Sequence, residues 1–211
     1  KFQKHNVEKN HKDRLFILLG FTIIGILFLL YSRMQDFSIT PDSLQSVERL
    51  AISFYVLLLL SFIAIAYGLY RYHQRKMMEN LSNILSVIAS TTWNNKSRKI
   101  FVVVFISYGM FFAFTSGIIV YQPDVMFSYH YDAIIPSAHL NSCCGEPGYM
   151  PEIIVYLSEH VGLQIIPINL VLVVVVSYLV GLNTSLAIKA ISITKKSGGL
   201  SSIGAITVLF I

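Results

Sequence analysis

The sequence predicts an all-α fold: a polytopic transmembrane helix bundle with four complete spans, a truncated fifth span, an interfacial amphipathic helix and one long external loop. Composition and hydropathy patterning support this class. Of the 211 residues, 55% are hydrophobic and only 13% are charged, whereas soluble domains carry about 25% charged residues. Uncharged apolar runs also recur with the length of roughly 20 residues that a helix needs to cross a bilayer.

Four apolar runs are long enough to cross a membrane, and a fifth is cut short. We expect spans at about 15–32, 50–70, 100–121, 162–188 and 200–211, the last covering about half a crossing. Residues 1–14 form a basic leader, and 15–211 are expected to form a single transmembrane domain. The first run lacks a small-residue cleavage pattern, which favours a retained anchor helix over a signal peptide. Because the chain opens on Lys1, we expect it to be a piece of a longer product.

The 16 Lys and Arg residues alternate between the segments that separate the spans. They are abundant in the leader, scarce in the first connection, abundant in 71–99, absent from 122–160 and present again after 188. Cytoplasmic loops carry the excess of positive charge in membrane proteins. This pattern predicts a multi-pass protein of the cell (plasma) membrane with a cytoplasmic N-terminus and an extracytoplasmic loop at 122–160. Because the basic residues flank spans, the net charge of +5 does not indicate nucleic-acid binding.

Two shorter segments have apolar residues at helical spacing. In 77–93 they predict an amphipathic helix, which lies either in the cytoplasmic interface or against the protein itself. In 151–160 they predict a short helix along the outer interface. Pro167 lies near the start of the fourth span, where a missing N–H is tolerated.

The four complete spans carry no Asp, Glu, Lys, Arg or His in their interiors. Pumps and ion-coupled transporters usually place such residues within the membrane. Asn169 and Asn183 are the polar intramembrane residues of note, and their spacing puts them on similar sides of one helix. They either hydrogen-bond to a neighbouring helix or line a polar pocket.

Small residues recur at intervals of four on three spans, which lets helix backbones approach closely in lipid. The predicted helix-packing residues are Gly109, Ala113 and Gly117 on the third span, and Ser177, Gly181 and Ser185 on the fourth, with a shorter stripe of Ala64 and Gly68 on the second.

The external loop holds both cysteines of the chain, Cys143 and Cys144, in the run SAHLNSCCGEPGYMPE. Disulfides persist outside the cytoplasm, so the pair is a disulfide or redox candidate, either within this chain or with a partner. Soft thiolates and imidazole suit copper or zinc, and His139 would join Cys143 on one face of a helical turn. A metal site at His139, Cys143 and Cys144 is therefore an open alternative, although the spacing matches no common zinc pattern.

The run HLNSCCGEPGYMPEIIVYLSEHVGLQIIPINLVL resembles segments of small polytopic membrane proteins from archaea. Proteins of this kind are similar to the accessory subunits that surround archaeal membrane oxidoreductases, including ammonia monooxygenase. The resemblance implies a helical accessory subunit in an enzyme complex whose copper chemistry belongs to other subunits. It covers this one run and the general architecture, and it transfers no copper-site residue to this chain.

These observations predict a non-catalytic integral membrane subunit of a larger membrane complex, in its most specific version one of the copper-dependent ammonia or methane monooxygenase type. Its partners would be other membrane subunits and the lipid bilayer. The sequence indicates no catalytic or cofactor-binding residues, and copper or zinc only at the external loop. Two other functions stay open: a thiol–disulfide oxidoreductase using Cys143 and Cys144, and a small metal or solute transporter.

Overall fold

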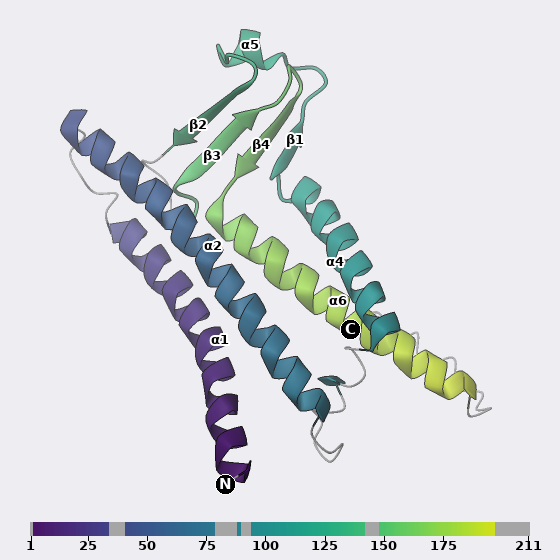
Figure 1. Cartoon of the computed structure of the whole chain (residues 1–211). Helices are drawn as coiled ribbons and strands as arrows, with labels where there is room; N and C mark the ends of the chain where they lie inside the picture. The colour runs from purple at the N-terminus through teal and green to yellow at the C-terminus, as the bar shows by residue number, and fades with distance from the viewer. Residues whose placement is uncertain (1, 34–40, 79–87, 90–93, 142–147, 197–211) are drawn as a thin grey trace. The chain divides into compact units, whose positions relative to one another are not determined.

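The computed structural model describes residues 2–33, 41–78, 88–89, 94–141 and 148–196 of the chain. Long helices make up most of it (Figure 1): α1 (Phe2–Arg33), α2 (Pro41–Met78), α4 (Asn95–Thr115) and α6 (Pro167–Lys196). The segment between α4 and α6, here called the sheet module, contains β1 (Ile119–Tyr121), α5 (Phe127–His130), β2 (Ser137–Asn141), β3 (Glu152–Tyr156) and β4 (Val161–Ile165).

Each of the four long helices contains a stretch long and apolar enough to cross a membrane: Arg14–Arg33, Ser46–Met77, Asn95–Thr115 and Pro167–Ser192. Many of their large apolar side chains are exposed, as at Leu18, Ile63 and Val103. Such surface suits lipid contact, because water does not tolerate apolar patches of this extent. The prediction of four helices long and apolar enough to span a membrane is confirmed. The predicted interfacial helix at 77–93 lies mostly outside the described residues, and the fifth span at 200–211 lies wholly outside them.

The chain groups into two compact units. One consists of Lys1–Asp13, Leu69–Phe111 and Val174–Ile211, and the other of Arg14–Gly68 and Phe112–Val173. The second unit therefore contains the sheet module, most of α1 and α2, and the first turns of α6. This grouping follows spatial proximity and does not test the predicted division into a leader, 1–14, and one domain, 15–211, which stays a prediction.

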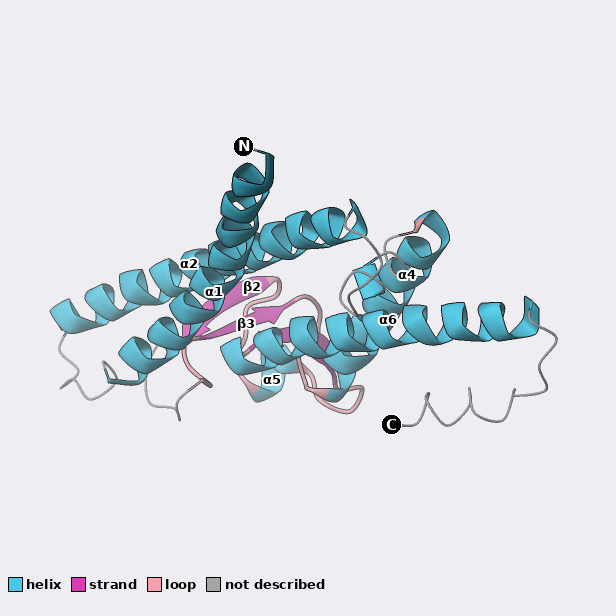
Figure 2. Cartoon of the chain, turned by 90° about the horizontal axis from the view of Figure 1, so that it is seen from below, coloured by secondary structure: helices cyan, strands magenta, loops and turns pink. Residues whose placement is uncertain are grey.

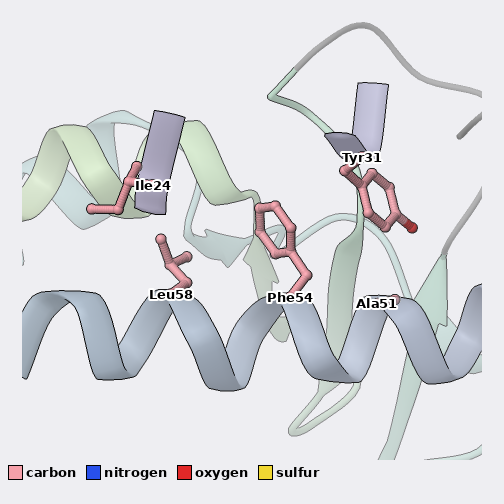
Figure 3. Close-up of a cluster of buried hydrophobic side chains, with 5 residues drawn as sticks. All are labelled: Ile24, Tyr31, Ala51, Phe54 and Leu58. Carbon is pink, nitrogen blue, oxygen red and sulfur yellow. The ribbon is translucent and has the colours of Figure 1, made fainter. Parts of the chain in front are cut away.

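The core of the second unit lies between α1 and α2. Ala51, Phe54 and Leu58 recur at three- and four-residue intervals, which places them on one face of α2. They meet Ile24 and Tyr31 of α1 in a buried cluster (Figure 3), in which the ring centroids of Tyr31 and Phe54 are 5.4 Å apart. Side chains of the sheet module and of α6 cover this cluster: Leu140, Met150, Leu170 and Val171.

The sheet module forms an antiparallel sheet with strand order β1-β4-β3-β2 (magenta in Figure 2). Ile119 pairs with Leu163, Val155 pairs with Leu163 from the other side, and Ala138 pairs with Val155. The all-α class is therefore wrong for 119–165, and the predicted external loop at 122–160 contains two strands and a short helix. The predicted helix at 151–160 is also wrong, because the β-branched run in EIIVY favours an extended strand.

Two span boundaries differ from the prediction for identifiable reasons. The third span ends at Thr115 rather than 121, because the chain turns at Gly117, whose φ of +76° suits glycine, and then enters β1. The fourth begins at Pro167 rather than 162, because Val161–Ile165 pairs with two other strands. Proline at the first helical position has no N–H to leave unpaired there.

Gly20 lies where α1 and α2 approach each other closely. A Cβ atom added at Gly20 would collide with the side chain of Ile65 and would lie 3.0 Å from the carbonyl oxygen of Ser61. At Gly25, on the same helix, an added Cβ would meet nothing within 4 Å. Small residues at such crossings allow the tight packing that holds helices together in lipid.

We expect Gly20→Val to destabilise the packing of α1 on α2 by about 1–3 kcal/mol, the usual cost of overpacking. Gly25→Val makes the same change of residue in the same helix and should leave stability nearly unchanged. Thermal unfolding of the purified chain in detergent measures both. Equal melting temperatures for the two variants would contradict the assigned helix crossing.

Candidate functional site

The hydroxyl group of Tyr55 connects helix α2 to the sheet module. Its oxygen lies 2.6 Å from the carbonyl oxygen of Pro151 and 2.8 Å from that of Ile165, so that its proton is donated between these two acceptors. Pro151 precedes β3 and Ile165 ends β4, and these two positions lie at the same end of the sheet. We call this end the base of the module, and the opposite end, formed by 121–136 and 157–160, its tip.

Next to the base lies a buried carboxylate. Glu152 is 8% exposed, and Oε1 of its carboxylate accepts a hydrogen bond from Nε2 of Gln164 on the neighbouring strand. A buried carboxylate is costly unless it is paired. The sheet module itself contains no Lys or Arg, since none occurs between Lys99 and Lys189. Glu152 is thus paired with a neutral amide from the neighbouring strand.

One face of the sheet carries a cavity of about 210 Å³. The strand register places Glu152, Ile154 and Tyr156 on this face, because alternate residues of a strand point to the same side. The cavity is lined by Val120, Gln122, Phe127, Tyr131, Ile154, Tyr156, Gly162, Leu163 and Gln164. All of these belong to the sheet module, so one compact unit forms the whole cavity.

Three aromatic rings form one wall of the cavity. The ring centroid of Phe127 lies 5.3 Å from that of Tyr156 and 5.9 Å from that of Tyr131. Gly162 forms the floor, where an added Cβ would be tightly placed, 3.2 Å from a backbone oxygen and 3.4 Å from the Phe127 ring. Gln122 adds a polar group to the cavity lining. Its side-chain oxygen Oε1 is buried without a hydrogen-bond partner in the described structure.

Polar contacts tie the tip of the module together. Nδ1 of His160 lies 3.1 Å from the carbonyl oxygen of Gln122 and 3.0 Å from that of Val125, so it carries the proton and donates to both. The carboxylate of Glu159 accepts hydrogen bonds from the backbone N–H and the hydroxyl of Ser128. These contacts hold α5 against the turn between β3 and β4, and they give His160 a structural role.

Of the three residues in the predicted metal and redox site, the structure describes only His139. His139 lies on β2, exposed, with Nε2 at 3.1 Å from the hydroxyl oxygen of Ser137. The chain is extended from 137 to 141, so the helical turn proposed to join His139 to Cys143 is wrong. Cys143 and Cys144 fall outside the described residues. Within 2–33, 41–78, 94–141 and 148–196, no three His, Cys, Asp or Glu side chains form a metal-binding group, and the cysteine and metal hypotheses stay predictions.

The small-residue stripes lie where α4 and α6 meet. A Cβ added at Gly109 would lie 3.3 Å from the hydroxyl oxygen of Ser177, and one at Gly181 would lie 3.2 Å from the carbonyl oxygen of Phe101. Ser177 and Ser185 are buried on α6. Ala113 is partly buried on α4, whereas Gly117 follows the end of that helix and is not part of a helical stripe.

The two intramembrane asparagines lie in different environments. The side-chain amide of Asn169 donates a hydrogen bond of 3.0 Å to the carbonyl oxygen of Ser116, just past the end of α4. The final carbonyl groups of a helix lack partners within that helix, so this contact joins the end of α4 to the start of α6. Asn183 is exposed on α6. The predicted pairing with a neighbouring element thus holds for Asn169.

Sequence reasoning missed the residues that attach the sheet module to the helices. Gly20 has no small partner four residues away, so no stripe marked it. Tyr55 carries a hydroxyl group inside an apolar run, which requires a partner in lipid and was the available signal. Glu152 and Gln164 become a pair only when β3 and β4 align.

Comparison with known protein families, curated proteins and solved structures finds no match for this chain. Function is therefore inferred from the residues and their geometry.

We expect Tyr55→Phe to destabilise the protein by about 1–2 kcal/mol, because burying two carbonyl groups without their donor is costly. The ring stays, so packing against Phe54 is retained. Tyr121→Phe removes a hydroxyl from a side chain that is 64% exposed and should have little effect. Thermal unfolding in detergent compares the two. A Tyr55→Phe variant that melts with the wild type would show that this hydroxyl does not anchor the sheet.

We expect Asn169→Leu to destabilise the protein by about 1 kcal/mol, the order of interhelical hydrogen bonds in membranes. Asn183→Leu is the matched control, since it makes the same change on an exposed face of the same helix. The free energy of unfolding in mixed micelles, measured by denaturant titration, distinguishes the two. A larger loss for Asn183→Leu would reverse the assignment.

Proposed function

We propose that this chain is a non-catalytic integral membrane subunit that docks a partner protein on the tip of its sheet module. The observation that carries the proposal is a group of exposed apolar side chains at this tip, outside the spanning helices. These are Met126 (52% exposed), Tyr129 (90%), Ile134 (77%) and Leu157 (51%), together called the tip patch.

Lipid is a poor candidate to cover the tip patch. The patch lies at the end of the strands opposite the first turn of α6, and five-residue strands of about 3.3 Å per residue separate the two. Exposed apolar patches outside a membrane mark sites of protein interaction. Tyrosine is also enriched in such interfaces, since its ring provides area and its hydroxyl tolerates water.

The charge of the tip indicates what kind of surface its partner has. The tip carries Asp124, Asp132 and Glu159, and the sheet module contains no Lys or Arg. Anionic lipid headgroups repel such a surface, and so does a second copy of the same tip. Complementary potentials favour association, so the partner surface is apolar with a basic rim.

The location follows from the distribution of Lys and Arg. The basic leader and the basic connection at 71–99 lie on the cytoplasmic side, and the tip patch is extracytoplasmic in the cell membrane. The most specific version of the proposal is an accessory subunit of a copper-dependent monooxygenase-type complex, based on the resemblance of the run at 139–172. In every version the tip patch binds another subunit.

The test places a photo-crosslinking amino acid at position 129 and purifies the tagged chain from its native membranes. We expect crosslinks to one membrane-associated protein, at a segment rich in Lys or Arg, and a stable complex in native mass spectrometry. The double variant Tyr129→Ser/Ile134→Ser should lower recovery of the partner about tenfold or more, as for interface anchor residues.

Tyr149→Ser is the control, because Tyr149 is 50% exposed but lies near the base rather than the tip. It should leave recovery of the partner unchanged. Crosslinks to lipid alone, or to a second copy of this chain, would contradict docking of a different subunit. So would full recovery of the partner by the double variant.

A further inference from the structure

We propose that the cavity on the sheet module binds a small organic ammonium ion that carries at least one N–H group. This site is separate from the tip patch, and its occupation does not depend on the docking proposal. The inference depends on the size of the cavity, its unpaired acceptor, its aromatic wall and the sign of the surrounding charge.

The cavity is the size of a small molecule. Its volume is about 210 Å³, below the roughly 300–1,000 Å³ of pockets that hold drug-sized ligands. Gly162 lies at its floor, where an added Cβ would lie 3.2 Å from a backbone oxygen of β3 and 3.4 Å from the ring of Phe127.

The cavity lining contains a hydrogen-bond acceptor, the side-chain oxygen of Gln122, that a ligand donor could pair. Oε1 of Gln122 is buried and accepts no hydrogen bond within the described structure. Leaving a buried acceptor unpaired costs roughly 1–3 kcal/mol in proteins. The backbone of Gln122 is held in place by two hydrogen bonds. Its N–H donates to the carbonyl oxygen of His160, and its carbonyl oxygen accepts from Nδ1 of the His160 ring. A ligand N–H group would pair this oxygen.

The aromatic wall favours a cation. Ring faces carry partial negative charge and attract ammonium groups, most strongly where water is excluded. Phe127, Tyr131 and Tyr156 provide this wall, and the rings of Tyr131 and Tyr156 are stacked with their centroids 6.4 Å apart. The alcohol hydroxyls of uncharged ligands would gain no comparable attraction.

The charge around the cavity also favours a cation, because the nearby ionisable group is a carboxylate. The lining residue Gln164 uses its Nε2 to bind Glu152, whose buried carboxylate has no Lys or Arg near it in sequence. Low dielectric strengthens the field of such a charge. Anions such as phosphates or carboxylates are therefore disfavoured, and a ligand cation would supply the positive charge that the sheet module lacks.

Three probes of similar size test the charge preference by isothermal titration calorimetry of the purified chain. They are benzylammonium, benzyl alcohol and benzoate. We expect benzylammonium to bind at least about tenfold more tightly than the alcohol, and benzoate to bind more weakly than both. Tighter binding of either other probe, or no heat from benzylammonium up to about 10 mM, would overturn the proposal.

Substitutions test how much individual residues contribute to binding of the ammonium ion. Glu152→Gln keeps the shape and should weaken benzylammonium binding about tenfold while leaving the alcohol unchanged. Gln122→Leu should weaken benzylammonium similarly, and Gln74→Leu on α2 is the control that should not. Melting temperatures without ligand verify that each variant is folded, and the probe comparison on the unmodified chain remains decisive if one is not. Equal binding by Glu152→Gln and the wild type would contradict the role of the carboxylate.

Discussion

The hydroxyl group of Tyr55 is the contact on which the arrangement of the second unit depends. A bilayer admits helices because they satisfy their own backbone groups, and it excludes open sheets because their edges do not. The sheet module therefore has to lie beyond the apolar helices and still be attached to them. Tyr55 provides that attachment from α2, since its oxygen meets the carbonyl groups that flank β3 and β4. Asn169 does the same between α6 and the end of α4.

The sheet module is chemically unlike the helices that carry it. It contains no Lys or Arg, and two of its acidic groups are held by neutral donors: Glu152 by an amide, and Glu159 by a hydroxyl and a backbone N–H. Such a module has a negative potential that its own residues do not neutralise. This single property is the basis of both proposals, a basic partner surface at the tip and a cationic ligand in the cavity. The two sites use different side chains, because the tip patch projects outward and the cavity lies on a sheet face.

The helices could be predicted from the sequence and the sheet could not, because a helix depends on neighbouring residues whereas the sheet joins residues far apart in the chain. A spanning helix is specified by a local property, roughly 20 consecutive apolar residues, and every backbone partner lies four residues away. In contrast, β1 pairs with β4 across some forty residues, with Ile119 opposite Leu163. The strand EIIVY hides its own periodicity, because apolar residues occupy both faces of a central strand. Its β-branched content favours a strand, whereas the spacing of its apolar residues predicts a helix.

The sequence by itself determined the four apolar helices, the small residues where α4 meets α6, and a basic-residue pattern that predicts the orientation. Each of these is encoded in neighbouring residues, because bilayer thickness and helical periodicity act locally. Only the tertiary structure decided the sheet and its cavity, the Glu152–Gln164 pair and the crossing at Gly20. These features join residues that are remote in sequence, and strand register determines which side chains share a face. The buried oxygen of Gln122 is of this second kind, since its burial depends on the folded sheet module.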